Sequence, residues 1–122
     1  MSLTTARQRL LDALTAAGID TYYGWGAFSV PCVRVFPSQP WVAISGLAGG
    51  RRTQRWEVWV IAGRTDSSAT FDELEALVIS TNAAINQLPE FGHVEWNRPS
   101  ITDMGGTRYL ASRGVIETLM EV

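Results

Sequence analysis

The stretch TQRWEVWVIAG, residues 53–63, predicts the central strand of a sheet. Successive side chains of a strand point to opposite faces. One face of this stretch is continuously apolar and consists of Trp56, Val58, Val60 and Ala62. The other face begins charged and ends apolar, in the order Arg55, Glu57, Trp59 and Ile61. We expect helices to cover the first face, and the second face carries more apolar surface than a solvated face usually does.

Two amphipathic helices are predicted, one on each side of this strand in the sequence. Residues 3–17 repeat apolar side chains at helical spacing, and Gly18 follows where a helix commonly ends. The second helix runs to Leu88 and stops before Pro89. Its start at Thr70–Glu73 has the form of a capping box, in which Thr70 would cap the helix. The apolar stripe of this helix matches the Trp56 face of the central strand in length.

Shorter strands are predicted at residues 19–23, 30–36, 92–98 and 108–120. Pro31 and Pro37 favour an edge or near-edge position for the strand between them, because proline cannot donate to a ladder. Residues 38–52 are expected to form a long irregular connection, and residues 99–107 a connection with its turn at Asp103–Gly106. Gly114 suggests a bulge that exchanges the two faces of the last strand, whose inward face stays open.

These elements predict one α+β domain spanning residues 1–122. We expect a small, mostly antiparallel sheet of four to five strands, packed by two α-helices in the order α-β-β-β-α-β-β. A chain of 122 residues is long enough for a core without a disulfide or metal, and the single Cys32 excludes an internal disulfide. No apolar run approaches the ~18 residues of a membrane span, and no leader is visible, so we expect a soluble protein.

The sequence offers few residues for catalysis. It has one His, one Cys and no Lys, so nucleophiles and general bases are scarce. His93 and Glu95 share a strand face, but no third ligand stands at a recognisable metal-binding spacing. The glycines of residues 46–50 do not match a phosphate-binding loop, because the spacing is one residue short and Lys is missing. We therefore expect no enzyme, no cofactor and no metal.

The net charge of −2 argues against a protein that reads nucleic-acid sequence. Arg51, Arg52 and Arg55 form the only basic cluster. We interpret this cluster as the solvated end of a loop rather than as a phosphate site.

Three segments carry a resemblance to a known family: PCVRV at 31–35, WEVWV at 56–60 and GGTRYLA at 105–111. With the order of elements, they resemble the tail-terminator (tail-completion) proteins of long-tailed bacteriophages. The resemblance implies a non-enzymatic homo-hexameric ring that caps the tail tube, stops its polymerisation and joins it to the head–neck connector protein. DNA would pass through the ring without sequence-specific binding. The protein would assemble in the host cytoplasm and reside in the virion at the tail–neck junction, with the loop before the central strand ordered on assembly.

Three other interpretations stay open. A phage head–tail connector or stopper protein would bind portal-attached heads rather than the ends of tail tubes. A small cellular enzyme or ligand-binding domain would show a deep polar pocket around His93 and a stable monomer. A nucleic-acid binder that used Arg51 and Arg52 would show strongly salt-dependent affinity.

A ring of identical subunits joined head to tail needs two different, complementary patches on each subunit. Open strand edges and the half-apolar second face of the central strand can supply one patch. We expect the subunit or partner interface to use Trp41, Arg51, Arg52, Arg55, Trp59 and Ile61. Trp59 and Ile61 are expected to become buried only in the ring.

Replacing Trp59 with Asp should therefore reduce the particle size in solution, because a carboxylate cannot occupy a buried apolar contact without a large desolvation penalty. Light scattering of the purified variant beside the wild-type protein measures the change. An unchanged particle size would remove Trp59 from the interface.

Overall fold

The computed structural model describes residues 3–24, 26–44, 51–64 and 67–121. Side chains are described within these ranges except at 3–4, 40, 43–44, 51–52 and 119–121. The elements are α1 (Leu3–Ala16), β1 (Thr21–Tyr23), β2 (Cys32–Ile44), β3 (Arg51–Gly63), α2 (Ser68–Asn86), β4 (Glu95–Trp96), β5 (Ser100–Met104) and β6 (Thr107–Glu121). The α+β class is confirmed, with six strands rather than four or five.

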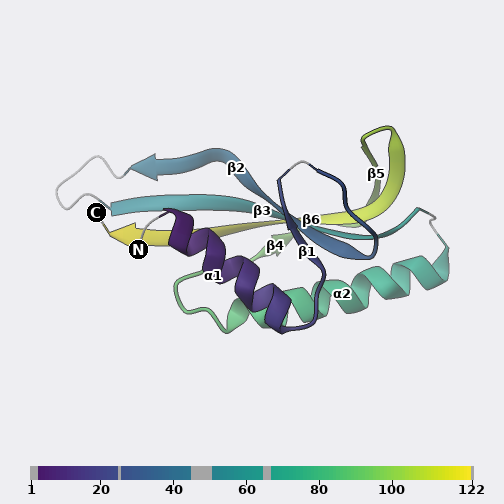
Figure 1. Ribbon diagram of the computed structural model, residues 1–122, viewed down its shortest axis with the longest axis horizontal. Helices are drawn as coiled ribbons and strands as arrows, with labels where there is room; N and C mark the ends of the chain where they lie inside the picture. The colour runs from purple at the N-terminus through teal and green to yellow at the C-terminus, as the bar shows by residue number, and fades with distance from the viewer. Residues whose placement is uncertain (1–2, 25, 45–50, 65–66, 122) are drawn as a thin grey trace.

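The sheet has the order β1-β2-β3-β6-β4, and β5 also pairs with β6. All pairings are antiparallel except that of β1 with β2. β3 is therefore central, as predicted, since β2 and β6 bond to its two edges along nearly its whole length. The three strands run side by side as one long, twisted ribbon (Figure 1).

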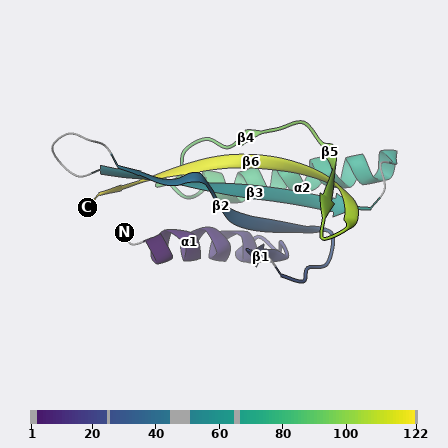
Figure 2. The ribbon, with the colours of Figure 1, turned by 90° about the horizontal axis from the view of Figure 1, so that it is seen from above.

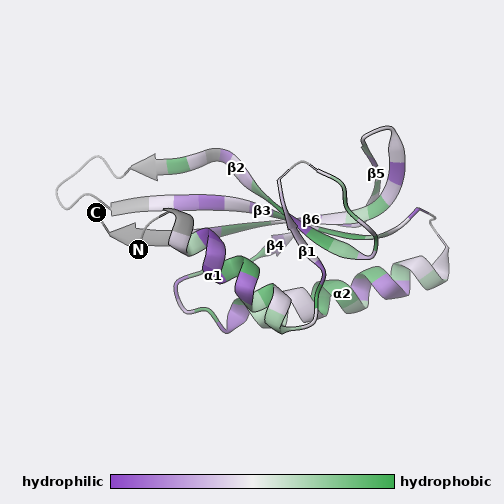
Figure 3. Ribbon diagram, in the orientation of Figure 1, coloured by the Kyte–Doolittle hydropathy of each residue, from purple (hydrophilic) through white to green (hydrophobic). Residues whose placement is uncertain are grey.

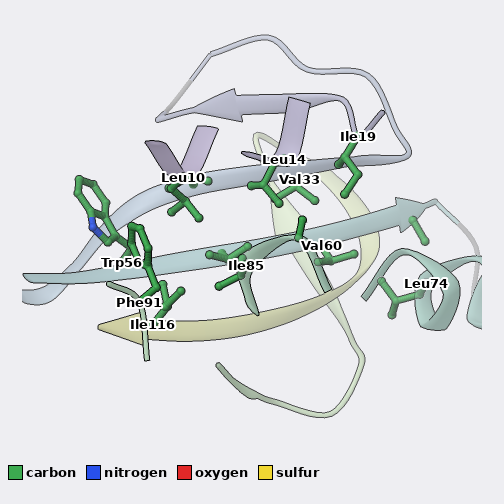
Figure 4. Close-up of a cluster of buried hydrophobic side chains, with 14 of the residues drawn as sticks. Leu10, Leu14, Ile19, Val33, Trp56, Val60, Leu74, Ile85, Phe91 and Ile116 are labelled. Atoms are coloured by element: carbon green, nitrogen blue, oxygen red, sulfur yellow. The ribbon is translucent and has the colours of Figure 1, made fainter. Parts of the chain in front are cut away.

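Both helices lie on the same face of the sheet (Figures 1 and 2). Apolar side chains of both helices pack against the strands in one buried cluster (Figure 4). The helices contribute Leu10, Leu14, Leu74 and Ile85, and the strands contribute Val33, Trp56, Val60 and Ile116. Each fully buried side chain of this kind contributes about 1.5–3 kcal/mol. Both helices carry hydrophilic as well as hydrophobic residues along their length (Figure 3), as expected of helices that bury one face and expose the other. The prediction that helices cover the Trp56 face is confirmed.

The opposite face of the sheet is also partly covered. Cys32, Ile61, Tyr109 and Ala111 form a second buried cluster there. Phe28 and Val30, from the connection between β1 and β2, pack on this cluster, and so does Met104 of β5. Ile61, at the apolar end of the second face of β3, is therefore buried by the chain itself.

The strands around the two predicted connections are longer than expected. Val42–Ile44 pairs with Arg52–Gln54 beyond an irregularity that begins at Pro37, so residues 38–44 continue β2. Asp103 accepts a hydrogen bond from the Gly106 N–H at 3.0 Å, and this turn joins β5 to β6 as a hairpin. The expectation of irregular structure was wrong at residues 38–44 and over β5, whereas the turn predicted at Asp103–Gly106 is confirmed. The glycine-rich residues 45–50 lie outside the described residues.

The start of α2 also differs from the prediction. Ser67 caps the helix, because its side chain accepts from the Thr70 N–H at 3.3 Å. Ser67 serves this role as well as Thr would, since both place an oxygen near the first free N–H groups. The capping box at Thr70–Glu73 was therefore placed three residues too late.

Gly114 does not exchange the faces of β6. Leu110, Gly114 and Ile116 all face the helices, and the register shift lies instead between Ile61 and Gly63 of β3. A Cβ on Gly114 would stand 2.6 Å from Val94 Cγ1 and 2.8 Å from the Trp96 ring. Glycine is required at this position because β4 pairs alongside β6 there, and the Val94 and Trp96 side chains fill the space that a Cβ would need.

Replacing Gly114 with Ala should destabilise the protein by about 1–3 kcal/mol, because the added methyl group displaces Val94 and Trp96 from a packed core. Urea unfolding measures the change. Gly26→Ala is the matched control, since no atom lies within 4 Å of its Cβ position. Equal midpoints for the two variants would contradict the packing described here.

Candidate interaction surface

An open groove of about 670 Å³ lies on the sheet face opposite the helices. Its walls are the connection between β1 and β2 and the hairpin of β5 and β6. Its floor is formed by neighbouring residues of β2 and β3. The lining side chains used below are Phe28, Arg34, Gln39, Glu57, Trp59 and Met104.

Arg34 is the most unusual residue of the groove, because it is 94 % buried and carries a charge. Its Nη2 donates to the Gly24 carbonyl oxygen at 2.9 Å, and its Nη1 approaches Met104 Sδ at 3.9 Å. The Phe28 and Phe36 rings lie 4.3 and 4.9 Å from Cζ. Nε has no hydrogen-bond partner. Aromatic contacts and one carbonyl group therefore hold a guanidinium that has no carboxylate partner among the described residues.

Trp59 lies on the groove floor and is half-buried. Its Nε1 donates to Glu57 Oε1 at 3.0 Å, and Glu57 Oε2 lies 3.8 Å from Arg113 Nη1. Trp59 is thus partly exposed in the single chain, and its burial in a ring stays a prediction.

Ile61 is completely buried within the single chain. The expectation that it becomes buried only on assembly was wrong. Alternation correctly placed Ile61 on the second face, but it does not reveal that Phe28 and Val30 return from another part of the chain to cover that face.

The other expected interface residues are not brought together into one site. Trp41 is 41 % exposed and packs edge-on against Trp56, with ring centroids 6.2 Å apart. Arg55 lies on β3 and pairs with Glu117 at 2.6 Å. Arg51 and Arg52 have their backbone in β3, but their side chains lie outside the described residues. The basic cluster thus has one described member, which already has a carboxylate partner.

Sequence reasoning missed Arg34, Phe28 and Met104. Arg34 had a visible signal, because it is the one charged residue in the apolar run VPCVRVF at 30–36. Phe28 and Met104 had no such signal, since only the tertiary fold places them beside β2 and β3.

Groups with reactive chemistry lie elsewhere. His93 and Glu95 are exposed. No cluster of three or more His, Cys, Asp or Glu suited to a metal occurs within the described ranges. Cys32 is fully buried, and burial raises the pKa of its thiol from 9.0 to about 11. No helix in the described part of the chain is long and apolar enough to cross a membrane.

The structure thus defines an α+β domain with helices on one face of its sheet and an open groove on the other. No family model and no curated sequence matches the chain. The fold is similar to a chain described as the virion of a native gene transfer agent (GTA) particle. That match has a TM-score of 0.51 and 14 % identity, and covers 95 % of this chain and 91 % of the other. A second solved chain matches with a TM-score of 0.50 and 13 % identity, over 98 % of this chain and 96 % of the other.

The thiol of Cys32 should resist aromatic disulfide reagents in the folded protein and react once the chain unfolds, because it is buried and stays protonated. Absorbance of the released thiolate measures the reaction with and without urea. In the unfolded chain the thiol loses its proton near pH 9.0, whereas in the folded protein its pKa is about 11. The stabilisation of the folded state that comes from burying the neutral thiol is therefore complete below pH 9.0 and is lost as the pH rises through about 11. Rapid labelling of the folded protein would contradict the burial.

Proposed function

We propose that this chain is a non-enzymatic virion assembly protein of the tail-terminator kind. Copies would form a hexameric ring that caps the tail tube, stops its polymerisation and contacts the head–neck connector, with DNA passing through the centre. The observation that carries the proposal is the likeness in fold to a chain of a gene transfer agent virion over nearly the full length of both chains. That likeness adds to the family resemblance of the sequence.

Open strand edges support an assembly role. β1 pairs with only Val33–Val35, so β2 has no neighbouring strand beyond Val35 on that side within the described residues. At the other side of the sheet, pairing along β6 ends with the bridge of Phe91 to Thr118. Unpaired N–H and C=O groups on such edges bind further strands. The two edges differ in sequence, as head-to-tail contacts between identical subunits require.

The shape of the sheet supports the same role. The strands β2, β3 and β6 extend together past the end of α1 toward the chain ends (Figure 1). Trp41 of β2 is exposed, and its ring is the kind of anchor that protein interfaces favour. We assign the extension to contacts with neighbouring subunits or with the tail tube.

Deleting the gene for this chain from a particle-producing strain should give tails that are longer than normal and variable in length, because no ring would stop the growth of the tube. Electron microscopy of negatively stained lysates measures tail length, and expression of the wild-type chain from a plasmid is the control. Heads filled with DNA beside tails of normal length would favour the connector or stopper role. Particles identical to the wild type would overturn the assembly role.

A further inference from the structure

We infer that the groove around Arg34 is one half of a contact between two copies of this chain, and that it binds carboxylates from α2 of the neighbouring copy. This inference rests on the proposed ring, for which it names the two complementary patches. The starting observation is the guanidinium of Arg34, which is buried without a carboxylate partner among the described residues.

Burial of a charged group is costly unless it is paired and hydrogen-bonded. The guanidinium of Arg34 has five N–H donors, and one oxygen among the described residues, the Gly24 carbonyl, accepts from it. Its contact with Met104 is to a thioether sulfur, which is a weak acceptor. Arg34 therefore keeps unused capacity to bind an anion in a place that is largely shielded from water.

The two carboxylates that line the groove are already engaged. Glu57 accepts from Trp59 Nε1 and lies near Arg113, and Asp103 accepts from the Gly106 N–H. Neither carboxylate forms an ion pair with Arg34 in the described part of the chain. A carboxylate from a neighbouring molecule would thus supply the negative charge that Arg34 lacks among the described residues.

Apolar side chains surround this cation. Phe28 and Phe36 contact the guanidinium, and Met104 and Trp59 line the groove beside it. Methionine adapts readily to the shape of a bound group, because its side chain is unbranched and flexible. The groove therefore fits a carboxylate that is flanked by apolar surface rather than an isolated anion.

The chain carries a surface of this chemistry on α2. Phe71, Asp72, Glu75 and Ile79 lie along one exposed side of the helix, at spacings that place them together. Phe71 is 37 % and Ile79 is 69 % exposed. Neither acidic residue forms an ion pair within the described residues. We call these four residues the α2 stripe.

The positions of the two patches suit a ring. The β5–β6 hairpin that walls the groove and the N-terminal end of α2 lie at the same end of the molecule, on opposite faces of the sheet (Figures 1 and 2). The α2 stripe of one copy can therefore meet the groove of the next, and the same contact can repeat around a closed ring.

Disulfide trapping tests the contact directly. One preparation carries Gln39→Cys at the groove, and the other carries Glu75→Cys on the α2 stripe. Native Cys32 is buried and does not compete. The two preparations are mixed at high concentration and oxidised. Dimers that join Gln39→Cys to Glu75→Cys should form in several-fold excess over dimers that join Gln39→Cys to Glu73→Cys. Glu73 is the matched control because it is exposed on another side of the same helix.

Charge reversal tests the role of the carboxylates. The double variant Asp72→Arg/Glu75→Arg should form smaller particles than the wild type in sedimentation, whereas Glu73→Arg should leave the particle size unchanged. Both positions of the double variant are exposed, so the subunit should keep its fold, which circular dichroism checks. Arg34→Met, added to the Gln39→Cys preparation, removes the cation and should lower the yield of the cross-link with Glu75→Cys several-fold, with circular dichroism again checking the fold.

Equal cross-linking at Glu73 and Glu75, or none at either, would overturn the inference. So would a groove cysteine that cross-links to a different virion protein in preference to a second copy. These outcomes are distinct from failure of the proposed function, because tail length in the deletion strain does not depend on which surfaces join the subunits.

Discussion

The pairing of β3 with β2 on one edge and β6 on the other is the constraint on which the rest of the structure depends. Because both edges are bonded, β3 cannot rotate, and the alternation of its side chains fixes what each face of the sheet must bury. Trp56, Val58 and Val60 face the helices. Ile61 faces the other way and is buried by the β1–β2 connection.

This arrangement explains why Arg34 is unusual. It pairs in register with Trp59, so it must point to the second face, at the point where the cover over that face ends. A charge at the border of a buried cluster loses much of its hydration while the groove beside it stays open. Aromatic contacts and the Gly24 carbonyl group offset part of that loss and hold the guanidinium in place.

The two faces of the sheet give the subunit different chemical surfaces. The helix side presents exposed acidic and apolar residues on α2, and the other side presents a buried cation beside apolar walls. Identical copies can bind head to tail only when their two contact surfaces differ in this way.

The sequence by itself determined the central strand, both helices, the α+β class and the face of β3 that the helices cover, because period-2 and period-3.6 patterns record burial along a single element. It did not determine the length of β2, the β5–β6 hairpin, the burial of Ile61 or the groove around Arg34. Those features depend on which distant segments return to the sheet. Only the tertiary structure decides them, because alternation shows which side chains share a face but not what covers that face.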